Sequence, residues 1–393
     1  MAQDGSQRNR RKKCSNCLRQ NSFQIQLFKR KSVTEDKLEI IQIVRNWGPV
    51  GGMEAYVWHL SHELAKRNCK VTIICENSHQ NISNSDIQEI EIGQFKRKPR
   101  WLQYWRFANY VEVKVQSLRS KKFIVVHSHE RSISHDITTF HTMPFATIKD
   151  KPWWKFISIR VWAYLKLEKQ ELGTSHNQTV RIIPVSRVLA NAIQKYYPEV
   201  TQSIQPAITP GVVSMPARLD RFTPRDGGTI GFIGKEWRRK GFALFIKIAE
   251  KLQSERPYLK VLVLGPQKEE VADLCKNFQG EISFEGWQPS DRFYQELDLL
   301  IHPATSEAYG MVIAEAMSCK VPVLVSDACG AAVDVSSIHG SVLSLNDSLD
   351  AWVKESNSWL NHNQILSPYQ RTWGQVAEEY LEQYQQIYQS KRI

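Results

Sequence analysis

The sequence is organised around one stretch in its second half, which reads His302-Pro-Ala-Thr-Ser-Glu307-Ala-Tyr-Gly310-Met-Val-Ile-Ala-Glu315-Ala-Met-Ser318. The apolar residues before it, 297–301, predict a buried strand, and residues 310–318 predict a helix. Glu307 then lies in the turn between them and Glu315 inside the helix. A strand, a turn and a helix therefore carry two carboxylates eight positions apart.

The residue types at this turn suit a sugar nucleotide. The amides of Gly310, Met311 and Val312 would begin the helix without partners, so they could bind a phosphate. A carboxylate has two acceptor oxygens and can bind two neighbouring hydroxyls, so one of the two glutamates could hold the transferred sugar and the other a ribose. The alternative is that both glutamates are solvated charges at a helix end.

Segment 307–317, the strand Val321-Pro-Val-Leu-Val-Ser326 and Ala328-Cys-Gly330 together resemble the retaining nucleotide-sugar glycosyltransferases of family 4. The resemblance spans about residues 37–390 and is strongest in the second half. It implies the α/β GT-B fold, with two Rossmann-like domains facing across a cleft and a last helix that crosses back to the N-terminal domain.

The same resemblance divides the chain. It implies an N-terminal acceptor-side domain over 37–212, a C-terminal nucleotide-sugar domain over 213–371 and the crossover helix over 372–393. Ile208-Thr-Pro210-Gly211-Val resembles the Pro-Gly-Val joint between the family's two halves, and the shift to Pro, Gly and Ser supports a boundary there.

Length and composition agree with this organisation. The chain has 393 residues, enough for two ordinary domains, and 42% hydrophobic with 23% charged residues is typical of a soluble globular protein. No stretch approaches eighteen apolar residues, and no apolar signal core follows the basic N-terminus, so we expect a cytoplasmic protein. A net charge of +12 indicates an acidic partner, which could be nucleic acid, an anionic membrane or a phosphorylated substrate.

The first 36 residues are expected to be a disordered basic extension. They contain Cys14 and Cys17, but a structural zinc site needs four ligands and no second pair follows at suitable spacing, so no metal is expected. The seven cysteines are an odd, scattered set, which indicates reduced thiols.

The first half opens as a Rossmann-like unit. Strand 38–45, a Gly-rich turn, helix 55–67 and strand 71–75 follow one another. Gly51 and Gly52 in the turn would let the backbone approach a ligand, although such turns are also ordinary loop chemistry. In the resembling family this loop faces the cleft near the donor phosphates and the acceptor.

Three histidines follow predicted strands of the first half, where ligands of open α/β sheets bind. A single histidine at a strand end is often structural. Thr139-Phe-His-Thr142, however, resembles the family segment whose histidine lies beside the donor sugar, which implies that role for His141. His127 and His129 are held as possible acceptor contacts.

The second half begins with strand 228–234 and the basic turn Lys235-Glu-Trp-Arg238-Arg239-Lys240-Gly241. Such bases could neutralise a pyrophosphate, or could form a solvated loop. The family commonly has Gly-Arg followed four residues later by Lys-Gly. Here Lys240 and Gly241 match, but Lys235 stands at the Arg position, and Arg238 or Arg239 could replace it.

The resemblance also places Gly265 in a turn near the nucleotide and Trp287 in the segment that meets the base. Taken together, the predicted catalytic residues are His141, Glu307 and Lys240. The predicted donor-binding residues are Gly51, Gly52, Lys235, Arg239, Lys240, Gly265, Trp287, Glu307, Gly310, Met311, Val312 and Glu315.

The predicted reaction is the retaining transfer of a hexose from a nucleotide sugar to a glycan or lipid-linked acceptor. Glu-Ala-x-Gly-x-Val and Arg-Arg-Lys-Gly are similar to motifs of the glucosyltransferases of the lipopolysaccharide core, which implies a UDP-hexose donor and a role in lipopolysaccharide or other cell-surface polysaccharide synthesis. No Asp-x-Asp motif is evident, which fits a metal-independent reaction without a cofactor.

Two stretches, 94–122 and 151–166, interleave bases with aromatic residues. They predict a peripheral protein on the anionic inner face of the cytoplasmic membrane. Alternatively, Trp153, Trp154 and Trp162 are core or helix-packing residues and the bases form a solvated rim. Two further alternatives stay open: a basic nucleic-acid-binding protein using Arg8–Lys13 and 94–122, and a catalytically inactive GT-B scaffold.

Overall fold

The computed structural model describes residues 37–79, 86–93, 98–121, 123–174, 180–218, 222–288, 290, 292–362 and 365–391. The extension predicted over 1–36, with Cys14 and Cys17, lies outside the described residues.

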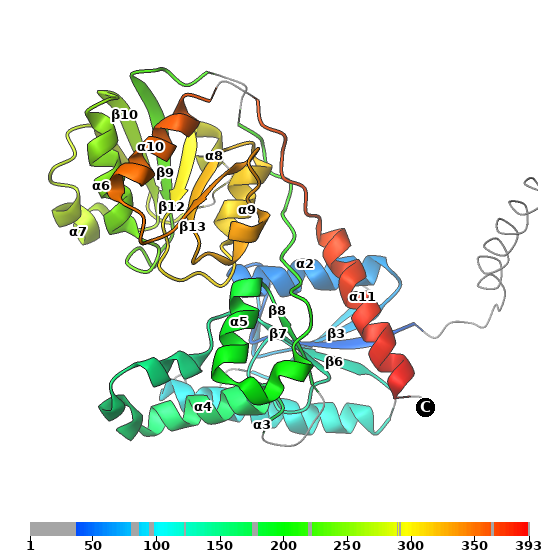
Figure 1. Cartoon of the computed structure of the whole chain (residues 1–393). Coiled ribbons are helices and arrows are strands. Elements are labelled where there is room, and N and C mark those ends of the chain that lie inside the picture. The colour runs from blue at the N-terminus through cyan, green and yellow to red at the C-terminus, as the bar shows by residue number, and fades with distance from the viewer. Residues whose placement is uncertain are drawn as a thin grey trace, which may run out of the picture. The chain divides into compact units, whose positions relative to one another are not determined.

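Among the described residues, a parallel sheet of six strands forms the first half, in the order β5-β3-β1-β6-β7-β8 (Figure 1). These strands are β1 (Glu39–Ile43), β3 (Lys70–Cys75), β5 (Ile87–Glu91), β6 (Val125–Ser128), β7 (Ile137–Phe140) and β8 (Arg181–Pro184). Most of their side chains are buried, as expected for a parallel sheet covered on both faces. A short parallel pair, β2 (Asn46–Trp47) and β4 (Asn77–Ser78), extends from the ends of β1 and β3.

The helices of this half are α2 (Gly52–Lys66), α3 (Arg100–Arg119), α4 (Ile159–Glu171) and α5 (Arg187–Tyr196). Of the mixed basic and aromatic stretch at 94–122, residues 100–119 form α3, a helix with one buried face, and residues 94–97 and 122 lie outside the described residues. That face packs Phe107, Val111 and Val115 against β1, β3 and β6. Burial of each such side chain contributes about 1.5–3 kcal/mol, so much of this stretch serves the core.

A second parallel sheet, again of six described strands, follows in the order β11-β10-β9-β12-β13-β14. These are β9 (Gly227–Ile233), β10 (Tyr258–Leu264), β11 (Glu281–Phe284), β12 (Leu299–His302), β13 (Val323–Ser326) and β14 (Gly340–Leu343). Its helices are α6 (Phe242–Gln253), α7 (Lys268–Val271), α8 (Phe293–Glu296), α9 (Met311–Ser318) and α10 (Leu349–Leu360). Phe232, Phe242, Phe245 and Trp352 fill its core.

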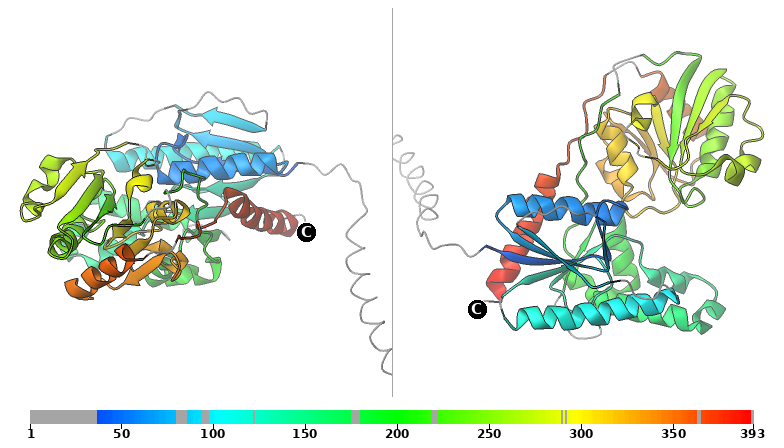
Figure 2. Two further views of the ribbon diagram at one scale, coloured as in Figure 1. Left: turned by 90° about the horizontal axis from the view of Figure 1, so that it is seen from above. Right: turned by 180° about the vertical axis from the view of Figure 1, so that it is seen from behind.

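The final helix, α11 (Trp373–Ser390), packs with the first half rather than the second. It lies beside α2 in both Figure 1 and the rear view of Figure 2. Its Tyr380 and Tyr384 are fully buried, and they reach Tyr56 of α2 and His127 of β6. The predicted return of the last helix to the N-terminal sheet is thus seen in its contacts. The domain boundary expected near residue 212 stays a prediction.

Candidate active site

The second half brings three charged side chains together where β9 and β12 end. Glu307 Oε2 lies 3.0 Å from Lys240 Nζ and 3.2 Å from Arg239 Nη1. Arg239 Nη1 also donates to the carbonyl of Ser306. This cluster unites Glu307, Lys240 and Arg239 as the sequence predicted.

Glycines allow this close approach. Gly241 has a φ of +82°, and a Cβ there would lie 1.9 Å from the carbonyl oxygen of Pro303, so a side chain does not fit. A Cβ at Gly234, at the end of β9, would meet the Lys240 side chain at 2.0 Å. Gly241 is therefore required beside Lys240, and Gly234 lets the Lys240 side chain pass directly over the backbone to reach Glu307.

The electrostatics of the cluster keep Glu307 ionised. Burial alone would raise the pKa of this carboxyl, but His302, Lys240 and Arg239 together hold the pKa well below its usual range. His302 Nε2 lies 3.8 Å from Glu307 Oε2, and the His302 ring is fully buried. No described residue gives either ring nitrogen of His302 a closer hydrogen bond.

Helix α9 begins at Met311, and its N-cap, Gly310, lies three residues after Glu307. The φ of Gly310 is +98°, a left-handed conformation that glycine adopts without strain. Within the described chain, no side chain caps this helix. The amides at its start, from Gly310 to Val312, therefore remain available to an anion.

Glu315 lies one turn into α9, and its Oε2 accepts a hydrogen bond of 2.6 Å from the Tyr294 hydroxyl. Burial raises the pKa of this carboxyl, while Tyr294 and the charge of Lys240 lower it. Oε1 of Glu315 and of Glu307 has no hydrogen bond to any described residue. Each carboxylate thus has one oxygen fixed and one available for a ligand hydroxyl.

The predicted nucleotide residues meet at the ends of β9, β10 and β11. Lys235 Nζ lies 4.2 Å from the centre of the Trp287 ring, and that ring is 58% exposed. The amide of Gly265 donates to the carbonyl of Gly286 over 2.7 Å, which holds two of the turns together. An exposed aromatic ring beside a lysine is a suitable surface on which a nucleobase could stack.

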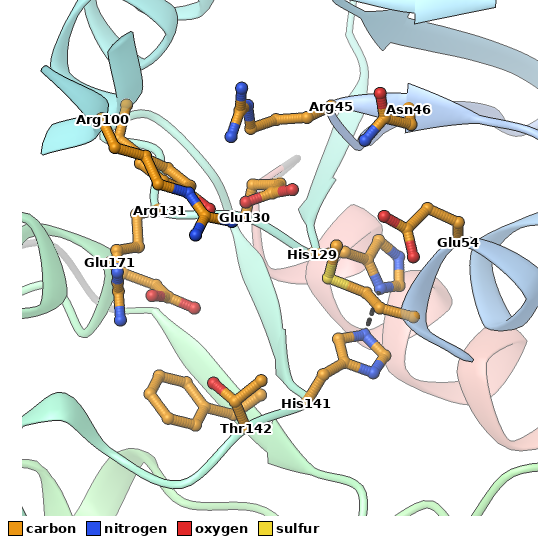
Figure 3. A pocket seen from close by; sticks show the side chains of 13 residues that line it. Arg45, Asn46, Glu54, Arg100, His129, Glu130, Arg131, His141, Thr142 and Glu171 are labelled. Carbon is orange, nitrogen blue, oxygen red and sulfur yellow. Dashed lines mark hydrogen bonds between the residues drawn. The ribbon is translucent and has the colours of Figure 1, made fainter. Parts of the chain in front are cut away.

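In the first half, Gly51 and Gly52 begin α2, beside a cavity of about 320 Å³ (Figure 3). The residues that line the cavity come from the ends of β1, β6 and β7 and from α2, α3 and α4. They are Arg45, Asn46, Met53, Glu54, Arg100, Tyr104, His129, Glu130, Arg131, Phe140, His141, Thr142 and Glu171.

Charged groups of both signs converge on this cavity. Arg45 is fixed by Glu76 at 2.6 Å, and its guanidinium lies 4.4 Å from the centre of the Tyr104 ring. Burial raises the pKa of Glu130 to about 7 and that of Glu171 to about 8. Guanidinium donors and carboxyl groups that face one cavity are suited to bind a ligand rich in hydroxyls.

The three predicted histidines lie close together but differ in their surroundings. His129 and His141 line the cavity and share a hydrogen bond of 2.9 Å. His127 is fully buried, and its ring nitrogens bond to Tyr384 and Thr139. Its predicted contact with an acceptor is therefore corrected, because neither nitrogen is available and the ring does not line the cavity.

Several residues of these sites were not predicted. Glu130 and Arg131 directly follow the segment that was noted for its histidines, so their charge was a usable signal. Nothing in the sequence indicated a role for Tyr294, because its contact with Glu315 depends on α8 packing against α9. Among the described residues, no group of three His, Cys, Asp or Glu side chains could hold a metal ion.

Two family models match the chain in succession. Residues 50–210 match "Glycosyltransferase Family 4" and residues 220–380 match "Glycosyl transferases group 1". A curated relative, the "Lipopolysaccharide glucosyltransferase WaaG" of Escherichia coli (strain K12), is 28% identical over 154 residues. This match covers 38% of the chain and 40% of the relative, so it spans about two fifths of that protein.

Solved structures match over most of the chain. WaaG, described as a glycosyltransferase involved in lipopolysaccharide biosynthesis, aligns with a TM-score of 0.65 and 16% identity over 87% of this chain and 95% of that chain. The sucrose-phosphate synthase of Thermosynechococcus elongatus aligns with a TM-score of 0.67 and 16% identity over 90% and 100%. HepE of Anabaena, solved with UDP and glucose, aligns with a TM-score of 0.56 and 12% identity over 89% and 100%. These likenesses confirm the predicted GT-B fold.

Proposed function

Because the chain belongs to the family 4 glycosyltransferases of GT-B fold, we propose that it moves a hexose from a nucleotide sugar to a glycan or lipid-linked acceptor. We propose UDP-hexose as the donor, retention at the transferred carbon, and no need for a metal. The likeness to WaaG supports a place in lipopolysaccharide or other cell-surface polysaccharide synthesis. The observation that carries the proposal is Glu307, held by Lys240 and Arg239 at the start of α9.

In this proposal the second half binds the donor. Oε1 of Glu307 accepts hydrogen bonds from the hexose, and Oε1 of Glu315 accepts them from the ribose. The pyrophosphate lies between them, against Lys240, Arg239 and the first amides of α9. Negative charge grows on that phosphate as the sugar leaves, and fixed cations and amides stabilise it without a proton donor.

The acceptor is assigned to the cavity of the first half. His141 lies at its edge and is proposed to contact the donor hexose, while His129, Glu130 and Arg131 face the acceptor. A sugar acceptor fits because carboxyl groups accept from its hydroxyls while guanidinium groups donate to them. No covalent nucleophile is invoked, and the donor phosphate is expected to take the proton of the attacking hydroxyl.

Thermal unfolding with a panel of nucleotide sugars tests the donor class. A donor present at 100 times its Kd should stabilise the fold by about 2.7 kcal/mol. We expect UDP-hexoses to raise Tm in wild type and to raise it less in Glu315→Ala. A panel that leaves Tm unchanged in wild type would contradict the assignment.

A membrane partner is also proposed, on an exposed apolar face that we call the Trp face. Its side chains are 58–74% exposed and comprise Trp153, Trp154, Ile157, Ile159 and Trp162. Lys151, Lys155 and Arg160 lie among them and are exposed. This exposure contradicts the alternative that the tryptophans fill the core, while the alternative of helix-packing residues with a solvated basic rim stays open. Rings and aliphatic side chains interleaved with bases suit an anionic bilayer surface.

This contact is proposed as peripheral, at the inner face of the cytoplasmic membrane. Along the helices that the structure describes, no segment is long and apolar enough to cross a bilayer. A lipid-linked acceptor would explain why an enzyme of this family needs such a surface on its acceptor-binding half.

A further inference from the structure

A buried hydrogen-bond chain begins at His141 and passes through the interior of the first half. His141 Nε2 lies 2.9 Å from His129 Nδ1, a contact drawn as a dashed line in Figure 3. His129 Nε2 lies 2.8 Å from Gln42 Oε1, and Gln42 Nε2 donates to the Tyr384 hydroxyl over 3.2 Å. The chain thus connects a cavity histidine, through the centre of β1, to helix α11.

The chain continues on the far side of Tyr384. The Tyr384 hydroxyl lies 2.7 Å from His127 Nδ1, and His127 Nε2 lies 2.7 Å from Thr139 Oγ1. The Thr139 hydroxyl lies 2.6 Å from that of Tyr380, which lies 3.0 Å from the hydroxyl of Tyr56. Tyr56 then donates to the carbonyl of Ile208 over 3.3 Å.

The Ile208 carbonyl sets the direction of this second branch, because a carbonyl can only accept. Tyr56 donates to it, so Tyr380 donates to Tyr56 and Thr139 donates to Tyr380. Thr139 must then accept from His127 Nε2. A neutral His127 therefore has a bare Nδ1, which accepts from Tyr384.

The same direction fixes the first branch. Tyr384 donates to His127, so it accepts from the amide nitrogen of Gln42, and the Gln42 oxygen must face His129. That oxygen only accepts, so His129 carries its proton on Nε2 and has a bare Nδ1. His141 must then donate from Nε2. A turned Gln42 amide would reverse every step and leave the Ile208 carbonyl without its donor.

Burial favours the neutral form of all three rings, those of His127, His129 and His141. Burial lowers the pKa of His127 and His129 well below the usual range and that of His141 to about 3. A neutral imidazole has one donor nitrogen and one acceptor nitrogen. The proton positions above therefore give every ring nitrogen of His127, His129 and His141 a hydrogen-bond partner except His141 Nδ1. No described residue bonds to that atom.

We infer that Gln42 and His129 are positioning residues that hold His141 with its proton on Nε2, so that Nδ1 presents a lone pair to a sugar hydroxyl. His141 can then accept a hydrogen bond but cannot donate one from that atom. The assignment of the hydroxyl to the donor hexose rests on the proposed function; the proton positions rest on the hydrogen-bond chain and on the neutral state of the buried rings.

The proton positions can be measured on the full chain without a substrate. In protein labelled with 15N in histidine, long-range 1H–15N correlation separates protonated from bare ring nitrogens, and the variants His141→Gln and His129→Gln assign the signals. We expect both His141 and His129 to have a protonated Nε2 and a bare Nδ1 at neutral pH. A protonated Nδ1 in His141, or a charged ring, would overturn the inference.

A pair of Gln42 variants then tests the positioning role. In Gln42→Glu, the protonated acid has the same acceptor and donor as the amide, so the spectrum of His141 should keep its wild-type form. Gln42→Met removes both groups, and the two His141 tautomers should then mix. In UDP-glucose hydrolysis, Gln42→Met should lower kcat/KM by about tenfold to hundredfold, and Gln42→Glu should recover most of this loss.

Tyr384→Phe covers the case in which Gln42→Met does not fold, since it removes one hydroxyl and keeps the ring. Gln42 then loses the contact that orients its amide, so His141 should again show mixed tautomers. A His141 spectrum unchanged by a folded Gln42→Met or Tyr384→Phe protein would contradict the inference. If the spectra agree but wild type binds no nucleotide sugar, the proposed function fails while the assigned proton positions stand.

Discussion

Lys240 Nζ lies 3.0 Å from Glu307 Oε2, and both side chains are more than four fifths buried, with 14% and 13% exposed. The pair joins the basic turn after β9 to the turn before α9, two segments that are almost seventy residues apart. Because Glu307 already holds the lysine in place, Lys240 would meet the proposed donor phosphate without reorganising. Such preorganisation is the condition for strong electrostatic stabilisation of a transition state.

Removal of Lys240 should therefore reduce turnover much more than stability. We expect Lys240→Ala to lower kcat for nucleotide-sugar hydrolysis by about a hundredfold or more, as for other charge-stabilising donors. Lys247→Ala, an exposed lysine of α6, is the matched control and should leave kcat unchanged. Steady-state kinetics together with thermal unfolding distinguish the cases. An unfolded Lys240→Ala protein would mean that the lysine is structural.

Glu315 and Tyr294 should affect donor binding. Glu315→Ala removes a carboxylate proposed to accept from the ribose, so binding of UDP should weaken by about 1.5–3 kcal/mol. Tyr294→Phe keeps the carboxylate but frees its Oε2, so a smaller loss is expected. Titration calorimetry with UDP measures both. Equal UDP affinity in Glu315→Ala and wild type would remove Glu315 from the site.

Glu171, which lines the cavity of the first half, makes the stability of the folded protein depend on pH. Burial is the largest cause that raises the pKa of this carboxyl to about 8; the charges of Glu168 and Glu130 also raise it, while Arg131 and the hydrogen bond from Thr138 lower it. The folded state therefore keeps a proton that the unfolded state loses near the ordinary pKa of about 4.3. Stability from this proton is present below pH 4.3 and is lost as pH rises to about 8.

Glu171→Gln does not titrate and can still accept the hydrogen bond from Thr138. We expect its Tm to exceed that of wild type by a margin that grows from pH 5 to pH 8 and then levels. Melting curves across this range measure the margin. A margin that stays constant, or that shrinks as pH rises, would show that the carboxyl is not held protonated in the folded protein.

The Trp face should bind anionic membranes. We expect the protein to co-sediment with phosphatidylglycerol vesicles but not with phosphatidylcholine vesicles, and to be released by high salt. Changing Trp153, Trp154 and Ile157 to serine should abolish this binding. Val333 and Ile338 are comparably exposed apolar residues of the second half, and their change to serine is the control.

The bases of the Trp face contribute separately. Replacing Lys151, Lys155 and Arg160 by glutamine should weaken vesicle binding by about 1 kcal/mol per charge at low salt and leave the fold intact. Binding that is equal for both vesicle types, or that survives in both variants at full strength, would exclude this face as the membrane contact.

The sequence predicted the order of the elements and the places in the fold of most residues of the proposed donor site. Glu307, Gly310 and Glu315 lie within one strand-turn-helix unit, so local pattern and spacing place them correctly. The Lys240 contact could be predicted because strand ends of a parallel sheet meet at one edge. The environment of the aromatic-basic stretch at 94–122 could not be predicted, since composition does not show that Phe107 and Val111 face the core.

The histidine chain could not be predicted from spacing. Gln42 and Tyr384 are 342 residues apart, and their contact exists because α11 returns to the first sheet. His127 lies on β6 and His129 one residue past its end, two positions apart, so strand alternation does not separate them. The tyrosines of α11 pack against the ring of His127 and bury it completely, while the ring of His129 lines the cavity. Such differences depend on packing between distant elements.

The proposed reaction cleaves the bond between a hexose and a nucleoside diphosphate at the Glu307 site. Family 4 transferases without an acceptor are expected to pass the sugar slowly to water, so release of UDP from UDP-hexoses in the presence of a chelator is the direct measurement. We expect steady UDP release by wild type, unaffected by chelator and at least about a hundredfold slower in Lys240→Ala. No UDP release from any hexose donor by folded wild-type protein, or equal release by Lys240→Ala, would contradict the proposed reaction.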